Sequence, residues 1–327
     1  MTAARVAVIH DRLTEASSKD ALDVLEQVAV VSKALEALGF VPEVVPFSLD
    51  LPRFMGEMSA LGPLFAFNLV ESVEGDGRLI HLAPALLEHM GVPYSGSPAE
   101  AVFVTSSKLL TKRALQAHGI DTPPWTSLED GDGFLGRDGR GPLLFKPVWE
   151  HASIGMDESA FVDGVDEALV RETLLKRDAR AGRRHFAEAY IEGREFNVAL
   201  LAGEVLPVPE IRFVDYPEGK PKVVDYRAKW EEGSFEYSHT PRSFDLADDD
   251  APIVERLRDV ALRCWRLFHL RGYARVDFRV DGSGRPWVLE VNVNPCLSPD
   301  AGFYASAERA GLDFTRVVKR IVDDIAR

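Results

Sequence analysis

The 327-residue sequence contains only two cysteines, Cys264 and Cys296, and they form no CxxC pair. Sparse cysteine argues against a disulfide framework or a structural zinc site and fits a reducing compartment. No run of about 18 apolar residues occurs, so we predict no membrane span. The opening run RVAVIHD is strand-like and shows no secretory signal pattern, so we expect a cytoplasmic protein.

An excess of basic residues is also missing, since the formal net charge is −14 at pH 7. This charge opposes nucleic-acid binding, which needs a basic face, but it does not oppose binding of a single nucleotide by a few lysines. No GxGxxG follows the first predicted strand, and no Walker A loop occurs. The sequence therefore predicts neither a dinucleotide fold nor a P-loop.

The strongest local pattern present is a hairpin over residues 272–300, closed by the turn sequence DGSG. Alternation with period two places the following polar side chains on one face: Arg275, Asp277, Arg279, Glu290, Asn292 and Asn294. Two carboxylates and a carboxamide are hard oxygen donors that suit Mg²⁺. The alternative is a solvated face, since any half-buried hairpin shows polar residues at every second position.

The first hundred residues alternate between strand and helix patterns. Apolar runs predict strands at 5–10, 41–46 and 64–70, and helical spacing predicts helices at 21–38 and 81–90. This order predicts an open doubly wound α/β sheet, with ligands approaching the carboxyl ends of its strands. For the acidic side chains in the loops at those ends, simple solvation is an equal alternative.

Lysines mark the middle of the chain. Lys108 lies in a predicted basic helix at 106–118, and Lys146 lies in an apolar strand at 143–148, where it must snorkel or meet an anion. The following small-residue loop, with Ser153, could bring backbone N–H groups to a phosphate, although an ordinary turn is as good a reading. The long polar stretch 216–238, with Lys229, is typical of an active-site lid.

Taken in order, Lys108, FKP, the small-residue loop, EAYIEGREF, DYRAKW, RVDF and EVNVNP resemble the ATP-grasp enzymes, and more narrowly the D-alanine–D-alanine ligase group. The likeness covers nearly the whole chain. It implies α/β and α+β architecture in three parts: an N-terminal open doubly wound α/β domain (1–104), a small central α+β lobe (105–185) and a C-terminal α+β lobe with the metal site (186–327). ATP would lie between the last two.

The resemblance also implies roles for individual residues. Catalysis would involve Arg275, Ser153 and Lys229, and two Mg²⁺ ions, with Mn²⁺ as an alternative, would be held by Asp277, Glu290 and Asn292. The implied nucleotide contacts are Lys108, Lys146, Glu188, Ala189, Tyr190, Ile191, Glu195 and Lys229. In this scheme Glu188 accepts the adenine amino group and Glu195 holds the ribose.

The implied activity is an ATP-dependent carboxylate–amine ligase that forms an amide bond through an acylphosphate and releases ADP and phosphate. Its partners would be small amino-acid-like carboxylate and amine substrates, and a homodimer is compatible with the resemblance. Three alternatives stay open: a true D-alanine–D-alanine ligase of peptidoglycan precursor synthesis, an ATP-grasp enzyme that stops at phosphorylation, and a non-catalytic nucleotide-binding protein.

Departures from the family pattern concentrate on the amino-acid side. For the acid that binds the first substrate's ammonium, Asp20 is the nearest positional match, with Glu15 and Asp23 as rivals. Glu71 adjoins Val70, which stands where the family usually has a histidine.

Two further departures concern the phosphate loop and the end of the hairpin. His151 replaces a glycine, and Trp230 stands in place of the lid tyrosine that would pair with Ser153. Cys296 also replaces a glycine, and Asp300 brings a negative charge close to where a second carboxylate would sit. Asn294, Asp300, Asp20 and Glu71 are the substrate candidates. Because Asp300 should repel a carboxylate and attract an amine, we predict a nucleophile other than D-alanine.

Overall fold

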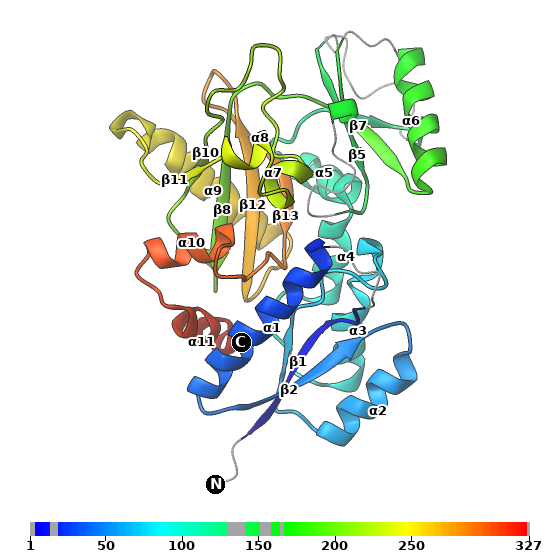
Figure 1. The fold of residues 1–327 in the computed structure, drawn as a ribbon, viewed down its shortest axis with the longest axis vertical. Coiled ribbons are helices and arrows are strands. Elements are labelled where there is room, and N and C mark those ends of the chain that lie inside the picture. Colours follow the sequence, from blue (N-terminus) through cyan, green and yellow to red (C-terminus); the bar gives the residue numbers. More distant parts are fainter. Residues whose placement is uncertain (1–3, 14–18, 130–140, 151–157, 164–166, 326–327) are drawn as a thin grey trace.

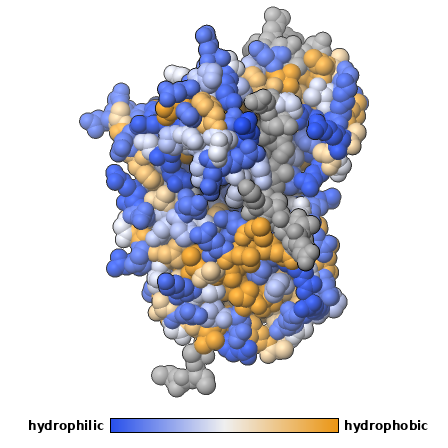
Figure 2. Space-filling view, viewed as in Figure 1, coloured by the Kyte–Doolittle hydropathy of each residue, from blue (hydrophilic) through white to orange (hydrophobic). Residues whose placement is uncertain are grey.

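The computed structural model describes residues 4–13, 19–129, 141–150, 158–163 and 167–325. Within these residues the strands form three sheets, of three, four and six strands. Figure 1 shows the three-stranded sheet in the lower part of the molecule and the other two in the upper part, facing each other. Figure 2 shows the most continuous hydrophobic surface of this face over the lower part.

The N-terminal sheet is parallel and has the order β2-β1-β3. Successive residues of β1 (Arg5–Asp11) point to opposite faces of the sheet. Val8 packs with α1 (Lys19–Ala37), whereas Ile9 packs with the helices at Leu51–Leu61 and Leu82–Met90. Helices thus cover both faces, which confirms the predicted open doubly wound α/β domain. The other elements here are β2 (Val41–Phe47), α2 (Leu51–Leu61), β3 (Ala66–Asn68), η1 (Gly77–Leu79) and α3 (Leu82–Met90).

Two helices, α4 (Ala99–Ser106) and α5 (Lys108–Ala117), lead into the second sheet, whose order is β4-β7-β5-β6. All pairings in this sheet are antiparallel. Val170 and Leu174 of α6 (Glu167–Ala181) cover one of its faces. The sheet comprises β4 (Trp125–Ser127), β5 (Leu143–Pro147), β6 (Phe161–Val162) and β7 (His185–Ala189), with η2 (Glu158–Ala160) before β6.

The third sheet is built around β12 (Tyr273–Val280), which pairs antiparallel with both β8 (Arg194–Leu201) and β13 (Pro286–Asn292). Val276 and Phe278 of β12 pack against α9 (Ala251–Leu267) on one face, so the intervening polar residues turn to the other face. The remaining elements are β9 (Glu204–Val205), β10 (Glu210–Ile211), α7 (Tyr226–Trp230), α8 (Phe235–Ser238), β11 (Arg242–Ser243), η3 (Asp248–Asp250), α10 (Gly302–Arg309) and α11 (Phe314–Asp323).

Gly193 lets the chain pass from the second sheet to the third. Its φ is 148°, and a Cβ placed there would lie 2.0 Å from the carbonyl oxygen of Val280. Any other residue would therefore force β8 away from β12. This glycine therefore lets the start of β8 pack closely against the β12–β13 hairpin, and so helps to position the side chains there.

Asp281 closes the β12–β13 turn and gives a stability prediction. Its carboxylate accepts hydrogen bonds from Ser283 Oγ at 2.6 Å and from Trp287 Nε1 at 2.8 Å, and these bonds lower its pKa from 3.8 to about 2. Asp281→Asn should lower the free energy of unfolding by about 1 kcal/mol at pH 7, after allowance for solvent screening. Because the folded pKa is depressed, the difference is present above pH 4 and shrinks as the pH falls toward 2.

Urea unfolding of both proteins between pH 3 and pH 7 measures this difference. A gap between wild type and Asp281→Asn that stays constant over that range would contradict the assigned pKa.

Candidate active site

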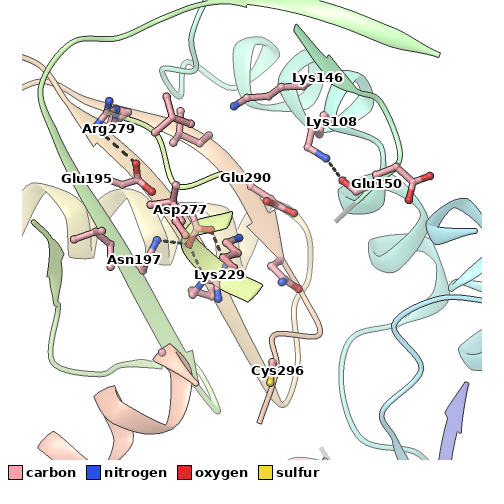
Figure 3. A pocket seen from close by; sticks show the side chains of 18 of the residues that line it. Lys108, Lys146, Glu150, Glu195, Asn197, Lys229, Asp277, Arg279, Glu290 and Cys296 are labelled. Carbon is pink, nitrogen blue, oxygen red and sulfur yellow. Dashed lines mark hydrogen bonds and ion pairs between the residues drawn. The ribbon is translucent and has the colours of Figure 1, made fainter. Parts of the chain in front are cut away.

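A cavity of about 520 Å³ lies between the second and third sheets (Figure 3). Its walls come from several elements far apart in the sequence, including α5, β5, β7, β8, α7, β12 and β13. The structure brings the following predicted residues together on these walls: Glu71, Lys108, Lys146, Glu188, Ala189, Tyr190, Ile191, Glu195, Lys229, Arg275, Asp277, Glu290, Asn292, Asn294 and Asp300. Ser153 lies outside the described residues, as does the side chain of Asp20.

The predicted metal face forms as expected from the alternation. Asp277 lies directly across the ladder from Glu290, and Arg275 lies across from Asn292. Asp277 is only 8% exposed and accepts hydrogen bonds from Arg275 Nε at 2.7 Å and from Asn197 Nδ2 at 2.9 Å. These two hydrogen bonds therefore fix the orientation of the Asp277 carboxylate inside the cavity.

The donor set on this face fits a hard divalent cation. Two carboxylates and the Asn292 carboxamide supply only oxygen ligands, which suits Mg²⁺ or Mn²⁺ better than a soft metal. Among the described residues no group of three or more His, Cys, Asp or Glu forms a metal cluster. The third predicted ligand is an amide, and its oxygen is oriented by the Asn294 N–H, 3.0 Å away.

Three lysines bring positive charge to the same cavity. Burial lowers the pKa of Lys108, against the opposing influence of Glu290, and Lys108 Nζ donates to the Glu150 carbonyl. Burial likewise lowers the pKa of Lys229, and neighbouring Arg275 adds to this effect. Lys146, the third, forms an ion pair with Glu188. Desolvated lysines in a cavity gain most from an anionic ligand such as a phosphate.

Lys229 reaches the cavity from α7, the first short helix in the stretch predicted as a lid. Asp225 caps this helix by accepting a hydrogen bond from the Ala228 N–H at 2.9 Å. Trp230, at the end of α7, also lines the cavity. The cap fixes the direction of α7 and so brings Lys229 toward Arg275 and Asp277.

Glu188 has partners that the sequence reading did not anticipate. One carboxylate oxygen pairs with Lys146 and the other lies 2.8 Å from Lys112 Nζ. Burial alone would raise the pKa of Glu188, but the two lysines outweigh it and hold the pKa below the usual value. Lysine partners on both oxygens leave less room for the predicted contact with an adenine amino group.

The predicted adenine-binding backbone is also partly engaged within the protein. The Ala189 N–H donates to the Pro124 carbonyl at 2.8 Å, and the Tyr190 N–H donates to the Pro142 carbonyl at 2.9 Å. A base edge would therefore have to be read by other polar groups of this segment, such as those of Ile191.

Glu195 faces Arg279, a residue of the predicted polar face of the hairpin to which no role was assigned. Burial raises the pKa of Glu195, whereas Arg279, with Nη1 3.7 Å from the carboxylate, opposes the rise. Arg279 Nη1 also donates to the Gly193 carbonyl at 3.1 Å, and its guanidinium lies over the Tyr190 ring. The alternation that predicts Arg275 and Asp277 on this face places Arg279 there too, as the structure confirms, but no role was predicted for it.

The far end of the cavity is acidic. Of the three candidate acids in the first loop and helix, Asp23 is the one whose side chain the structure describes, and it lines the cavity together with Glu71. Gln27 Nε2 donates to both, at 3.1 Å to Asp23 and at 2.8 Å to Glu71. A shared donor holds the two carboxylates close together, which favours a cationic group between them.

Cys296 is held against the same acids. Its thiol donates to Asp23 at 3.0 Å, and burial, with Glu71 and Asp23 adding, raises its pKa far above the usual value. The side chain is thus a protonated donor and not a nucleophile. Asn294 is likewise committed to the protein, since its Nδ2 donates to the Val70 carbonyl at 2.9 Å.

Asp300 shares its wall of the cavity with Arg242, which the sequence analysis did not single out. The Arg242 guanidinium lies over Gly302, with Nε 3.3 Å from the place a Cβ would take. Burial and Arg275 lower the pKa of Arg242, whereas Asp300 raises it. The negative charge of Asp300 is therefore accompanied by an arginine, so this wall carries both signs.

Known proteins share this architecture. The family described as "D-ala D-ala ligase C-terminus" matches residues 115–323. A D-alanine–D-alanine ligase of Aquifex aeolicus is 31% identical over 295 residues, covering 89% of this chain and 92% of that protein. An uncharacterized protein of Sinorhizobium fredii, y4sG, is 32% identical over 263 residues, covering 79% and 73% respectively. A crystal structure of the Bacillus anthracis D-alanine–D-alanine ligase gives a TM-score of 0.74 at 25% identity, covering 99% of this chain and 98% of that chain.

The fold and the lysine- and carboxylate-lined cavity define an ATP-grasp ligase, an enzyme that forms C–N bonds. Within that class, the chain belongs to the D-alanine–D-alanine ligase family. Among the described residues, no helix has the length and apolar character needed to cross a bilayer.

Proposed function

We propose that this ligase joins a small amino-acid-like carboxylate to an amine other than D-alanine, through an acylphosphate and with release of ADP and phosphate. The observation that supports ATP-driven chemistry is the meeting of Lys108, Lys146 and Lys229 with Asp277 and Glu290 on one cavity. A carboxylate and a triphosphate repel each other, and such a set of charges is what their reaction requires.

In the proposed mechanism the lysines act on the phosphates. Lys108 and Lys146 hold the nucleotide, and Lys229 approaches the γ-phosphate from α7. Asp277, Glu290 and Asn292 would hold two Mg²⁺ ions, which when bound neutralise phosphate charge. Glu195 would accept hydrogen bonds from the ribose, and Ser153 would help to bind phosphate, as the family resemblance implies.

Arg275 has the second role, at the acyl centre. The substrate carboxylate attacks the γ-phosphate, and the amine then attacks the resulting acylphosphate carbonyl. Negative charge develops on the carbonyl oxygen in this step, and Arg275 with backbone N–H groups near Cys296 would stabilise it. A cavity closed from water by α7 and its neighbours would protect the acylphosphate from hydrolysis.

The two substrates are proposed to occupy the acidic end and the mixed-charge wall. Asp23, one of the predicted rivals of Asp20, and Glu71 would hold the ammonium of the carboxylate substrate. Asp300 would disfavour a free carboxylate on the amine substrate, but Arg242 offsets part of that repulsion. An amine with a neutral or cationic group toward Asp300 fits this wall better than D-alanine does.

The test is turnover of MgATP with panels of D- and L-amino acids and amines, with hydroxylamine as a trap. We expect ADP and phosphate release that depends on the carboxylate substrate, with an acyl hydroxamate when hydroxylamine replaces the amine. Accumulation of D-alanyl-D-alanine from D-alanine alone at millimolar concentration would contradict the proposed amine. Nucleotide binding without any turnover would point to a non-catalytic protein.

The main alternative is a D-alanine–D-alanine ligase, which similarity to relatives such as the Aquifex aeolicus ligase favours. The division of the chain into domains at 1–104, 105–185 and 186–327 also stays a proposal. Strand β7 crosses the boundary at residue 185, and it pairs within the second sheet. A homodimer and a cytoplasmic location likewise remain predictions.

A further inference from the structure

Lys112 is a buried cation just behind the nucleotide end of the cavity. It follows Lys108 by one turn on α5, but its side chain is only 1% exposed. Its ammonium donates to Thr122 Oγ1 at 2.9 Å and to the Pro123 carbonyl at 3.0 Å, and it lies 2.8 Å from Glu188 Oε2. Two hydrogen bonds and one ion pair thus hold the ammonium of Lys112 inside the protein.

The charges around Glu188 are unequal. The carboxylate, itself 1% exposed, is shared between Lys112 and Lys146. With Lys146 alone, the buried pair would be neutral and the carboxylate would draw the lysine away from any other anion. With Lys112 present, two lysines and one carboxylate carry a net charge of about +1.

That surplus charge is located at Lys146 for a structural reason. Lys146 lines the cavity, and its side chain is 13% exposed, whereas the hydrogens of Lys112 are used inside the protein. An incoming phosphate can reach Lys146 without breaking the contacts of Lys112. The cavity therefore presents Lys146, whose partner carboxylate Glu188 is already paired with Lys112 on its buried side.

We propose that Lys112 is a positioning residue that neutralises Glu188 from behind, so that Lys146 keeps its charge for the phosphates of the nucleotide. The inference rests on the proposed use of ATP. Lys112 touches neither the nucleotide nor the reacting atoms, and its effect passes through Glu188 and Lys146.

A purely structural role would give a different pattern. Thr122 Oγ1, which accepts from Lys112, donates to the Val288 carbonyl at 2.7 Å, two residues before Glu290 on β13. If Lys112 only anchored this strand, its loss would disturb the cavity generally. A charge effect instead weakens phosphate binding selectively and is reversed when the opposing charge is also removed.

The experiment is calorimetric titration of the full-length protein with ADP and, separately, with adenosine, both in excess Mg²⁺. Lys112→Met and Lys112→Gln should each bind ADP about tenfold more weakly, whereas affinity for adenosine should stay within about twofold of wild type. Lys112→Gln can still donate hydrogen bonds and so guards against a failure of Lys112→Met to fold. Adding Glu188→Gln to either variant should restore ADP affinity to within about threefold of wild type.

Lys176→Met is the matched control, because it removes the same charge from a lysine of α6 that is 72% exposed. Its ADP affinity should not change. Equal loss of ADP and adenosine binding, or a double variant no better than the single one, would overturn the proposal. Failure of the wild-type protein to bind ADP at all would refute the proposed function first, which separates the two outcomes.

Discussion

Replacing Asp277 by asparagine should lower kcat by about a thousandfold while the protein still folds. Asp277 is buried at the centre of the proposed metal face, opposite Glu290. Asparagine keeps the shape but removes the charge that would hold a divalent cation. Loss of about 4 kcal/mol of transition-state stabilisation corresponds to this factor. Phosphate release at saturating MgATP and substrates measures it.

Asp281→Asn is the matched control for Asp277→Asn, since it removes one carboxylate from the turn of the same hairpin. It should lower stability, as described above, and leave kcat within about twofold of wild type. An Asp277→Asn enzyme that keeps more than a tenth of wild-type kcat would show that this hairpin does not hold the catalytic metal.

Arg275→Met should lower kcat by a hundredfold or more and leave ADP affinity nearly unchanged. The guanidinium is oriented by two bonds to Asp277, at 2.7 and 2.8 Å, and lines the cavity where the acyl centre is proposed to lie. A donor that meets developing negative charge contributes mainly in the transition state, and removing one typically costs a factor of 10² to 10³. Asp277 keeps its hydrogen bond from Asn197 in this variant.

Arg279→Met, two residues further along β12, offers the contrasting result. Arg279 faces Glu195 and Tyr190 at the proposed nucleotide end. Its loss should raise the KM for ATP more than it lowers kcat. If Arg275→Met instead raised the KM for ATP and spared kcat, the assignment of Arg275 to the acyl centre would be wrong.

Local patterns predicted the hairpin well. Period-two alternation in β12 and β13 is enforced by packing of Val276 and Phe278 on α9, so the face of Asp277 and Glu290 could be read from the sequence alone. The doubly wound N-terminal domain was predictable for the same reason, since its strands and long helices carry clear periodicity. The helix α2 (Leu51–Leu61) was not predicted, although Leu51, Phe54, Met58 and Leu61 recur at helical spacing and Asp50 caps its start.

Partnerships between distant segments could not be predicted in this way. Lys112 and Glu188 are 76 positions apart, and nothing in either segment indicates that both are buried and paired. Asp300 and Arg242 lie on the same wall of the cavity because β11 packs beside the start of α10, which the sequence pattern does not specify. The net charge of a site depends on all the side chains that the fold brings together. Counting Asp300 without Arg242 therefore overestimates the negative charge on this wall of the cavity.

The bonds between α1 and the end of the hairpin have a consequence for how the protein assembles. Asp23 accepts a hydrogen bond from Ser298 Oγ at 2.9 Å, and Gln27 accepts one from the Leu297 N–H at 3.0 Å, across 275 and 270 residues. Contacts of such separation close the largest loops and form late in folding. We therefore expect the contacts at the acidic end of the cavity to form after the β12–β13 hairpin, whose strands are neighbours in the chain.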